Sequence, residues 1–204
     1  MKKSTLKDDI IEAVKEIFIE AVSRNNNFEE DDKKGKNPLV ISENDLTCHR
    51  FMKLYNPPER MISTELRIYK TRRYHDMAIF DEPDAGNKCK CFYKKNRRGN
   101  PEEWYCGRFL AMIEIKNNWF YSASVVKVNL QEDLDSLRKE KEISDLLFQI
   151  YFDYKGTLDK QDLKNIMKRY PGIHTIYGDL KNRKLYHAFC RTRKNCSRPV
   201  RNLI

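Results

Sequence analysis

The segment RFLAMIEIK, residues 108–116, constrains the fold more than any other part of the chain. Its apolar centre runs from Phe109 to Ile113, and Glu114 and Lys116 come directly after it. A short apolar run of this kind, bounded by turn residues, is typical of a strand. Side chains two positions apart on a strand project from the same face. The segment therefore predicts a strand that ends in a carboxylate and an amine on one face.

A second strand is expected over HDMAIFDEPD, residues 75–84, which also has a short apolar centre. If the two strands are antiparallel neighbours, the start of this strand faces the end of the other one. That pairing places Asp76 beside Glu114 and Lys116 at one edge of the sheet. Asp84 lies about 26 Å further along an extended strand, so it is excluded from this group.

Hydrophobic periodicity places further elements around these two strands. The residues between them, with KNRRGNP as the tip, are expected to form an inserted hairpin. The other expected helices are at 5–23, 42–55, 128–142 and 157–170, and the other expected strands are at 61–69 and 146–154. A closing hairpin is expected around Lys181 and Asn182. This order predicts an α+β fold with a mixed β-sheet flanked by helices.

At 204 residues the chain is expected to form one domain. This single domain, 1–204, comprises an N-terminal helix and linker (1–41), a core (42–154) and a C-terminal extension with a basic tail (155–204). No apolar run approaches the length of a membrane span, and the basic start MKKSTLKDD meets acidic residues before any apolar stretch. We therefore expect a cytoplasmic protein with no membrane partner.

The net charge of +10 is concentrated in two places. One is the stretch around the Glu-x-Lys, and the other is the tail KNRKLYHAFCRTRKNCSRPVRNLI, which has no acidic residue. Clustered Lys and Arg side chains are the electrostatic footprint of a polyanionic partner. The residues expected to bind nucleic acid are Arg67, Lys70, Arg72, Arg73, Lys95, Arg97, Arg98, Arg191, Arg193 and Lys194.

The chain contains six cysteines. Because no export signal is recognisable, they are expected to be reduced thiols. Structural zinc is a less favoured alternative, since the spacing within each candidate ligand set is irregular. The two sets are Cys89, Cys91 and Cys106, and His187, Cys190 and Cys196.

The pattern Arg73-x-x-Asp76-hydrophobic, then hydrophobic-Glu114-x-Lys116, then a Leu-rich helix, resembles the PD-(D/E)XK nuclease superfamily. The resemblance covers roughly residues 42–154 and implies a restriction-endonuclease-like core. The motif itself is short and degenerate, and the order of the surrounding elements gives it weight.

The resemblance implies an endonuclease that hydrolyses DNA phosphodiester bonds with Mg²⁺ or Mn²⁺. Asp76, Glu114 and the carbonyl group of Ile115 would hold the metal, which favours oxygen ligands. Lys116 would activate or orient the attacking water and stabilise the developing negative charge.

The family also implies a helical glutamate, for which Glu43 is the candidate. Glu12 and Glu16 of the first helix are rivals, and Glu65 on the neighbouring strand is another carboxylate within reach. Two features depart from the family pattern: His75 replaces the usual proline, and a long insertion separates the two motif strands.

Two other functions stay open at this point. One is a nucleic-acid-binding module without catalysis, with or without zinc. The other is a protein-interaction domain whose basic surface meets an acidic partner. A homodimer is also compatible with the resemblance, since many nucleases of this fold pair to cut two strands.

Overall fold

The computed structural model describes residues 5–25, Leu54, 61–68, 73–80, 89–118, 121–192 and 200–204. In several strands only the backbone is described, which applies to residues 61, 65–68, 73–74, 89–93 and 103. The helices are α1 (Leu6–Asn25), α4 (Ala123–Arg138) and α5 (Lys160–Met167). The strands are β1 (Met61–Ile68), β2 (Arg73–Phe80), β3 (Cys89–Lys95), β4 (Pro101–Gly107), β5 (Phe109–Asn118), β6 (Ser144–Asp153), β7 (Ile173–Asp179), β8 (Lys184–Ala188) and β9 (Val200–Asn202).

The described strands form one mixed sheet of nine strands in the order β3-β4-β1-β2-β5-β6-β7-β8-β9. β5, β6 and β7 are parallel neighbours, and the β1–β2, β2–β5 and β7–β8 pairs are antiparallel. The expected α+β class with a mixed sheet flanked by helices is confirmed. The antiparallel neighbourhood of β2 and β5 is confirmed as well.

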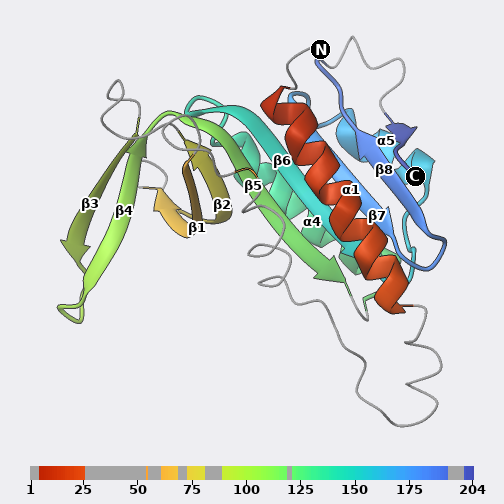
Figure 1. Ribbon diagram of the computed structural model, residues 1–204, viewed down its shortest axis with the longest axis horizontal. Coiled ribbons are helices and arrows are strands. Elements are labelled where there is room, and N and C mark those ends of the chain that lie inside the picture. Colours follow the sequence, from red (N-terminus) through yellow and green to blue (C-terminus); the bar gives the residue numbers. More distant parts are fainter. Residues whose placement is uncertain are drawn as a thin grey trace, which may run out of the picture.

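Helices cover both faces of the sheet (Figure 1). α1 packs on the face to which Met77, Ile113 and Ile150 point, whereas α4 and α5 pack on the face to which Ala78 and Met112 point. Since successive side chains of a strand alternate between faces, Asp76, Glu114 and Lys116 belong to the α4 face.

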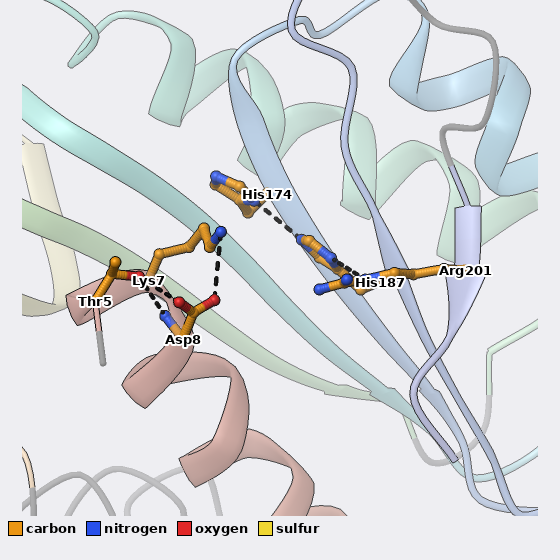
Figure 2. Close-up of polar contacts among 6 residues, drawn as sticks. All are labelled: Thr5, Lys7, Asp8, His174, His187 and Arg201. Atoms are coloured by element: carbon orange, nitrogen blue, oxygen red, sulfur yellow. Dashed lines mark hydrogen bonds and ion pairs between the residues drawn. The ribbon is translucent and has the colours of Figure 1, made fainter. Parts of the chain in front are cut away.

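The start of α1 is fixed by its own side chains (Figure 2). The backbone N–H of Asp8 donates to Thr5 Oγ1 at 3.3 Å, and Thr5 Oγ1 donates to Asp8 Oδ2 at 2.6 Å. A threonine whose oxygen accepts an N–H of the first turn is a preferred N-cap. Lys7 lies 3.3 Å from the Asp8 carboxylate. The helix expected over 5–23 is therefore confirmed.

α4 begins and ends earlier than the sequence pattern predicts. It starts after the N-cap Ser122 rather than at residue 128, and residues 139–143 form turns rather than helix. Its buried face carries Val126, Leu130, Leu134 and Leu137, which repeat at helical spacing. α5 is also shorter than expected: it starts after Asp159, which caps it by accepting from the N–H of Asp162 at 2.7 Å, and it ends at Met167.

The inserted hairpin is confirmed as β3 and β4, which are joined by a turn over residues 96–100. The closing hairpin is confirmed as β7 and β8. β9, which pairs with β8, was not expected. The helix expected over 42–55 lies outside the described residues except for Leu54, which is buried. In the part of the chain that the structure describes, no helix has the length and apolar character needed to cross a membrane.

Candidate functional site

Asp76 lies where the β2–β5 ladder ends. The register runs from Ile79 opposite Ala111 to Met77 opposite Ile113. One step further, the backbone N–H of Ile115 donates to Asp76 Oδ2 at 2.7 Å. The Asp76 carboxylate thus accepts the N–H of β5 that a backbone carbonyl group of β2 would accept if the ladder continued. This hydrogen bond places Asp76 beside Glu114.

Glu114 forms a buried polar group with His75, the residue before Asp76, and with Glu140, which follows α4. Glu114 Oε1 is hydrogen-bonded to His75 Nδ1, and His75 Nε2 lies 3.3 Å from Glu140 Oε1. His75 and Glu140 are 1% and 0% exposed, and Glu114 is 7% exposed. The imidazole therefore lies between two carboxylates that are both withdrawn from water.

This environment shifts the protonation of the group. Burial by itself lowers the pKa of His75, but hydrogen bonds to Glu114 and Glu140, together with their charges, outweigh burial and raise the pKa to about 9. Burial raises the pKa of Glu114, the hydrogen bond from His75 opposes that effect, and the charge of Asp76 adds to it. A protonated His75 is thus a cation that lies between the two buried carboxylates at neutral pH and offsets part of their charge.

Asp133 of α4 joins the predicted trio. Burial raises the pKa of this half-buried aspartate to about 7; the charge of Lys116 opposes the increase, and the charges of Glu114 and Asp76 add to it. These interactions place Asp133 in the electrostatic neighbourhood of all three motif residues. Among the described residues it is a helical acid that interacts with these three groups.

The sequence carried a signal for Asp133 that the pattern analysis did not use. Asp133 follows Leu130 by three residues and precedes Leu137 by four, so it lies on the apolar face of α4 and not on its wet side. A single acid within an otherwise leucine-rich helix face is unusual, since charged residues are rarely placed there without a partner.

Gln149 of β6 lies next to these groups. It is the register partner of Glu114, it is 0% exposed, and its Nε2 is 3.4 Å from Asp133 Oδ2. Its Oε1 is buried and has no hydrogen-bond partner among the described residues. A buried amide oxygen without a donor is costly, so a further ligand near it would lower the free energy of the site.

The oxygen-rich composition of the site fits a hard divalent cation. Asp76 and Glu114 supply carboxylate oxygens, Asp133 supplies another, and Gln149 supplies an amide oxygen, which are donors that Mg²⁺ accepts. Among the described residues, however, no group of three or more His, Cys, Asp or Glu side chains has the geometry of a metal site.

The other predicted site residues divide into three groups. Glu12 and Glu16 lie on α1, which covers the opposite face of the sheet, so both are excluded as rivals at this site. Lys95, Arg97, Arg98 and Arg191 are exposed. Outside the described residues, or described only by their backbone, are Glu43, Glu65, Arg67, Lys70, Arg72, Arg73, Arg193 and Lys194.

The expectation of reduced cysteines is wrong for Cys190, which is disulfide-bonded. Absence of a recognisable export signal was not enough to assign its redox state. Its sulfur is thus not a zinc ligand together with His187 and Cys196. Cys106 is a free thiol, and the side chains of Cys89 and Cys91 lie outside the described ones.

His187 has a structural role instead (Figure 2). Arg201 Nε donates to His187 Nδ1 at 3.2 Å, so the proton of this ring is on Nε2, which donates to His174 Nδ1 at 2.9 Å. Burial is the main cause that lowers the pKa of His174 to about 3 and that of His187 to about 4. The neutral histidine pair links three strands by hydrogen bonds, since His174 belongs to β7, His187 to β8 and Arg201 to β9.

Comparison of this chain with protein-family models, with curated proteins and with solved structures gave no match.

Proposed function

We propose that this protein is a Mg²⁺-dependent endonuclease with a restriction-endonuclease-like core that hydrolyses DNA. The observation that carries the proposal is the bond from the N–H of Ile115 to Asp76, because it brings the aspartate of one strand to the Glu114-x-Lys116 end of the next. Asp76 comes from β2, and Glu114 and Lys116 come from β5, its antiparallel neighbour. The basic surplus of the chain supports a polyanionic substrate.

In the proposed mechanism Asp76, Glu114 and the carbonyl group of Ile115 would hold the metal, which when bound would supply a water molecule of lowered pKa and offset negative charge on the scissile phosphate. Lys116 would orient the attacking water and stabilise the charge that develops on the phosphate oxygens. Asp133 and Gln149 complete the polar lining from α4 and β6.

His75 and Glu140 contribute by positioning. The hydrogen bond to His75 restricts the rotamer of Glu114, and Glu140 holds the other side of the imidazole. Groups that fix a metal-binding carboxylate in this way maintain its orientation and charge. In this proposal His75, which stands where the family usually has proline, positions Glu114.

The test is cleavage of supercoiled and linear DNA, and of RNA, in Mg²⁺, Mn²⁺ or EDTA. Asp76→Asn and Lys116→Ala are the test variants, since Asn keeps an acceptor for the Ile115 N–H and both should fold. Asp145→Asn and Lys139→Ala, both exposed, are matched controls. We expect metal-dependent cleavage that falls at least about a hundredfold in the test variants alone. Cleavage that survives both test substitutions would refute the assigned site.

One observation favours a second function, nucleic-acid binding without catalysis. Glu114 already uses Oε1 for His75, and no three-residue metal group is present among the described side chains. Salt-sensitive DNA binding without cleavage in any metal would support this alternative.

A further inference from the structure

The hairpin of β3 and β4 extends from one end of the sheet as a two-stranded ribbon, which we call the arm (Figure 1). Its pairing is continuous from Cys89 opposite Gly107 to Lys95 opposite Pro101. Its base is held at Tyr105, which is the β4 residue paired with β1 and whose ring lies 5.7 Å from that of Phe80. The residues from 94 to 104 lie beyond this attachment.

The turn at the end of the arm is fixed by Asn96. Its Oδ1 accepts from the N–H groups of Arg98 and Asn100 at 2.9 and 3.0 Å, and its Nδ2 donates to Glu102 Oε1 at 3.0 Å. Gly99 completes the turn with a φ of +80°, a conformation that glycine adopts at little cost. The arginines beside Asn96 are therefore presented on an ordered tip.

The tip carries a concentrated positive charge. A groove of about 550 Å³ is lined there by Lys94, Lys95, Arg97, Arg98, Glu102 and Trp104. Four of these side chains are cationic and one is anionic, and all four cations are exposed. Such a surface is complementary to phosphate groups.

The shape of the arm selects between kinds of nucleic acid. Two paired strands lie about 4.8 Å apart, so the ribbon with its side chains fits the major groove of B-form DNA, which is about 12 Å wide. The major groove of an RNA duplex is too narrow and deep to admit it. We propose that the arm inserts into the major groove of B-form DNA and binds the phosphates on either side. This deepens the proposed function by naming the substrate as double-stranded DNA, and it rests on that function only for the choice of nucleic acid.

The connection between the arm and the candidate site limits the length of DNA involved. Glu114 follows Arg98 by 16 residues along the turn, β4 and β5, so the tip lies no more than about 53 Å from the carboxylate. At about 3.4 Å per base pair, a duplex of roughly 16 base pairs reaches both places. A 20-base-pair duplex is therefore a suitable probe.

The test measures binding of that duplex, and of RNA of the same sequence, in EDTA by fluorescence anisotropy at several salt concentrations. The arm variant replaces four cations: Lys94→Ser, Lys95→Ser, Arg97→Ser and Arg98→Ser. The control variant replaces four exposed cations on the turns after α4 and α5: Lys139→Ser, Lys141→Ser, Lys168→Ser and Arg169→Ser. Thermal unfolding shows whether both variants fold.

We expect the arm variant to bind DNA at least about tenfold more weakly at 0.1 M salt, with the slope of log K against log salt reduced by up to about 3.6. RNA affinity should change less than about threefold, and the control variant should bind DNA like the wild type. Equal losses for DNA and RNA, or an unchanged DNA affinity, would overturn the proposal.

A second measurement needs no variant. Guanine N7 lies in the major groove, so wild-type protein should protect N7 from dimethyl sulfate over a few consecutive base pairs. Full N7 reactivity in the complex would exclude insertion of the arm. Because both measurements are made without metal, arm-dependent binding without cleavage would refute only the nuclease, and cleavage without arm-dependent binding would refute only the arm.

Discussion

Replacement of His75 by glutamine should destabilise the protein strongly. The imidazole is the cationic partner of Glu114 and Glu140, and all three side chains are at least about nine-tenths buried. Removal of one partner from a buried ion pair costs about 3–5 kcal/mol, because the remaining charge is left without compensation. At about 2–4 °C per kcal/mol for a chain of this size, the melting temperature should fall by about 6–20 °C.

The assay is thermal and urea unfolding at pH 7 in EDTA, followed by circular dichroism. An exposed pair gives the matched control: Arg108 Nε donates to Asp145 Oδ1 at 2.8 Å, and Arg108→Gln should cost less than about 1 kcal/mol. The double variant His75→Gln with Glu140→Gln should regain part of the loss, because one buried carboxylate becomes neutral. A His75→Gln variant as stable as Arg108→Gln would show that the buried carboxylates do not depend on the imidazole.

The histidine pair predicts loss of stability in acid. His174 and His187 titrate near 6.5 when unfolded but only near 3 and 4 when folded, so their contribution is complete above pH 6.5 and is lost as the pH falls toward 4. For His187 this amounts to on the order of 3 kcal/mol, and urea midpoints from pH 7 to pH 4 should fall less steeply in a His174→Gln, His187→Gln variant. Two glycines at positive φ should differ in their response to alanine, as measured by urea unfolding at pH 7. A Cβ at Gly156 would lie 2.2 Å from Asp179 Oδ1 whereas one at Gly99 meets nothing within 4 Å, so Gly99→Ala should cost about 1–2 kcal/mol and Gly156→Ala clearly more; equal costs would contradict the role assigned to the Asp179 contact.

The strand pair that carries Asp76 and Glu114 could be predicted from the sequence. Each strand has a short apolar centre, and antiparallel pairing fixes which ends meet, so the neighbourhood of the two acids follows from local patterns. The inserted hairpin was predictable for a similar reason, since its turn residues lie between two chain segments that must return to the same sheet.

The partners of these residues could not be predicted in the same way. Whether Asp133 reaches β5, and Glu140 reaches His75 of β2, depends on the position and rotation of α4 across the sheet, which no local pattern encodes. The role of His75 depends in turn on Glu140, which lies far along the chain. β9 was missed because a three-residue strand with an exposed arginine has no periodicity, and it forms only because β8 offers an edge.

The anchoring of the arm has a consequence for where DNA would be cut. Tyr105 binds the arm to β1 and Phe80, and Phe109, fully buried, begins β5 with its N–H donating to the carbonyl oxygen of Ile143 at 2.7 Å. The chain is thus held on both sides of Gly107, which leaves little freedom between the tip and Glu114. Under the two proposals the protein would act as a ruler, and strand breaks would fall at a constant number of base pairs from the place where the arm enters the groove.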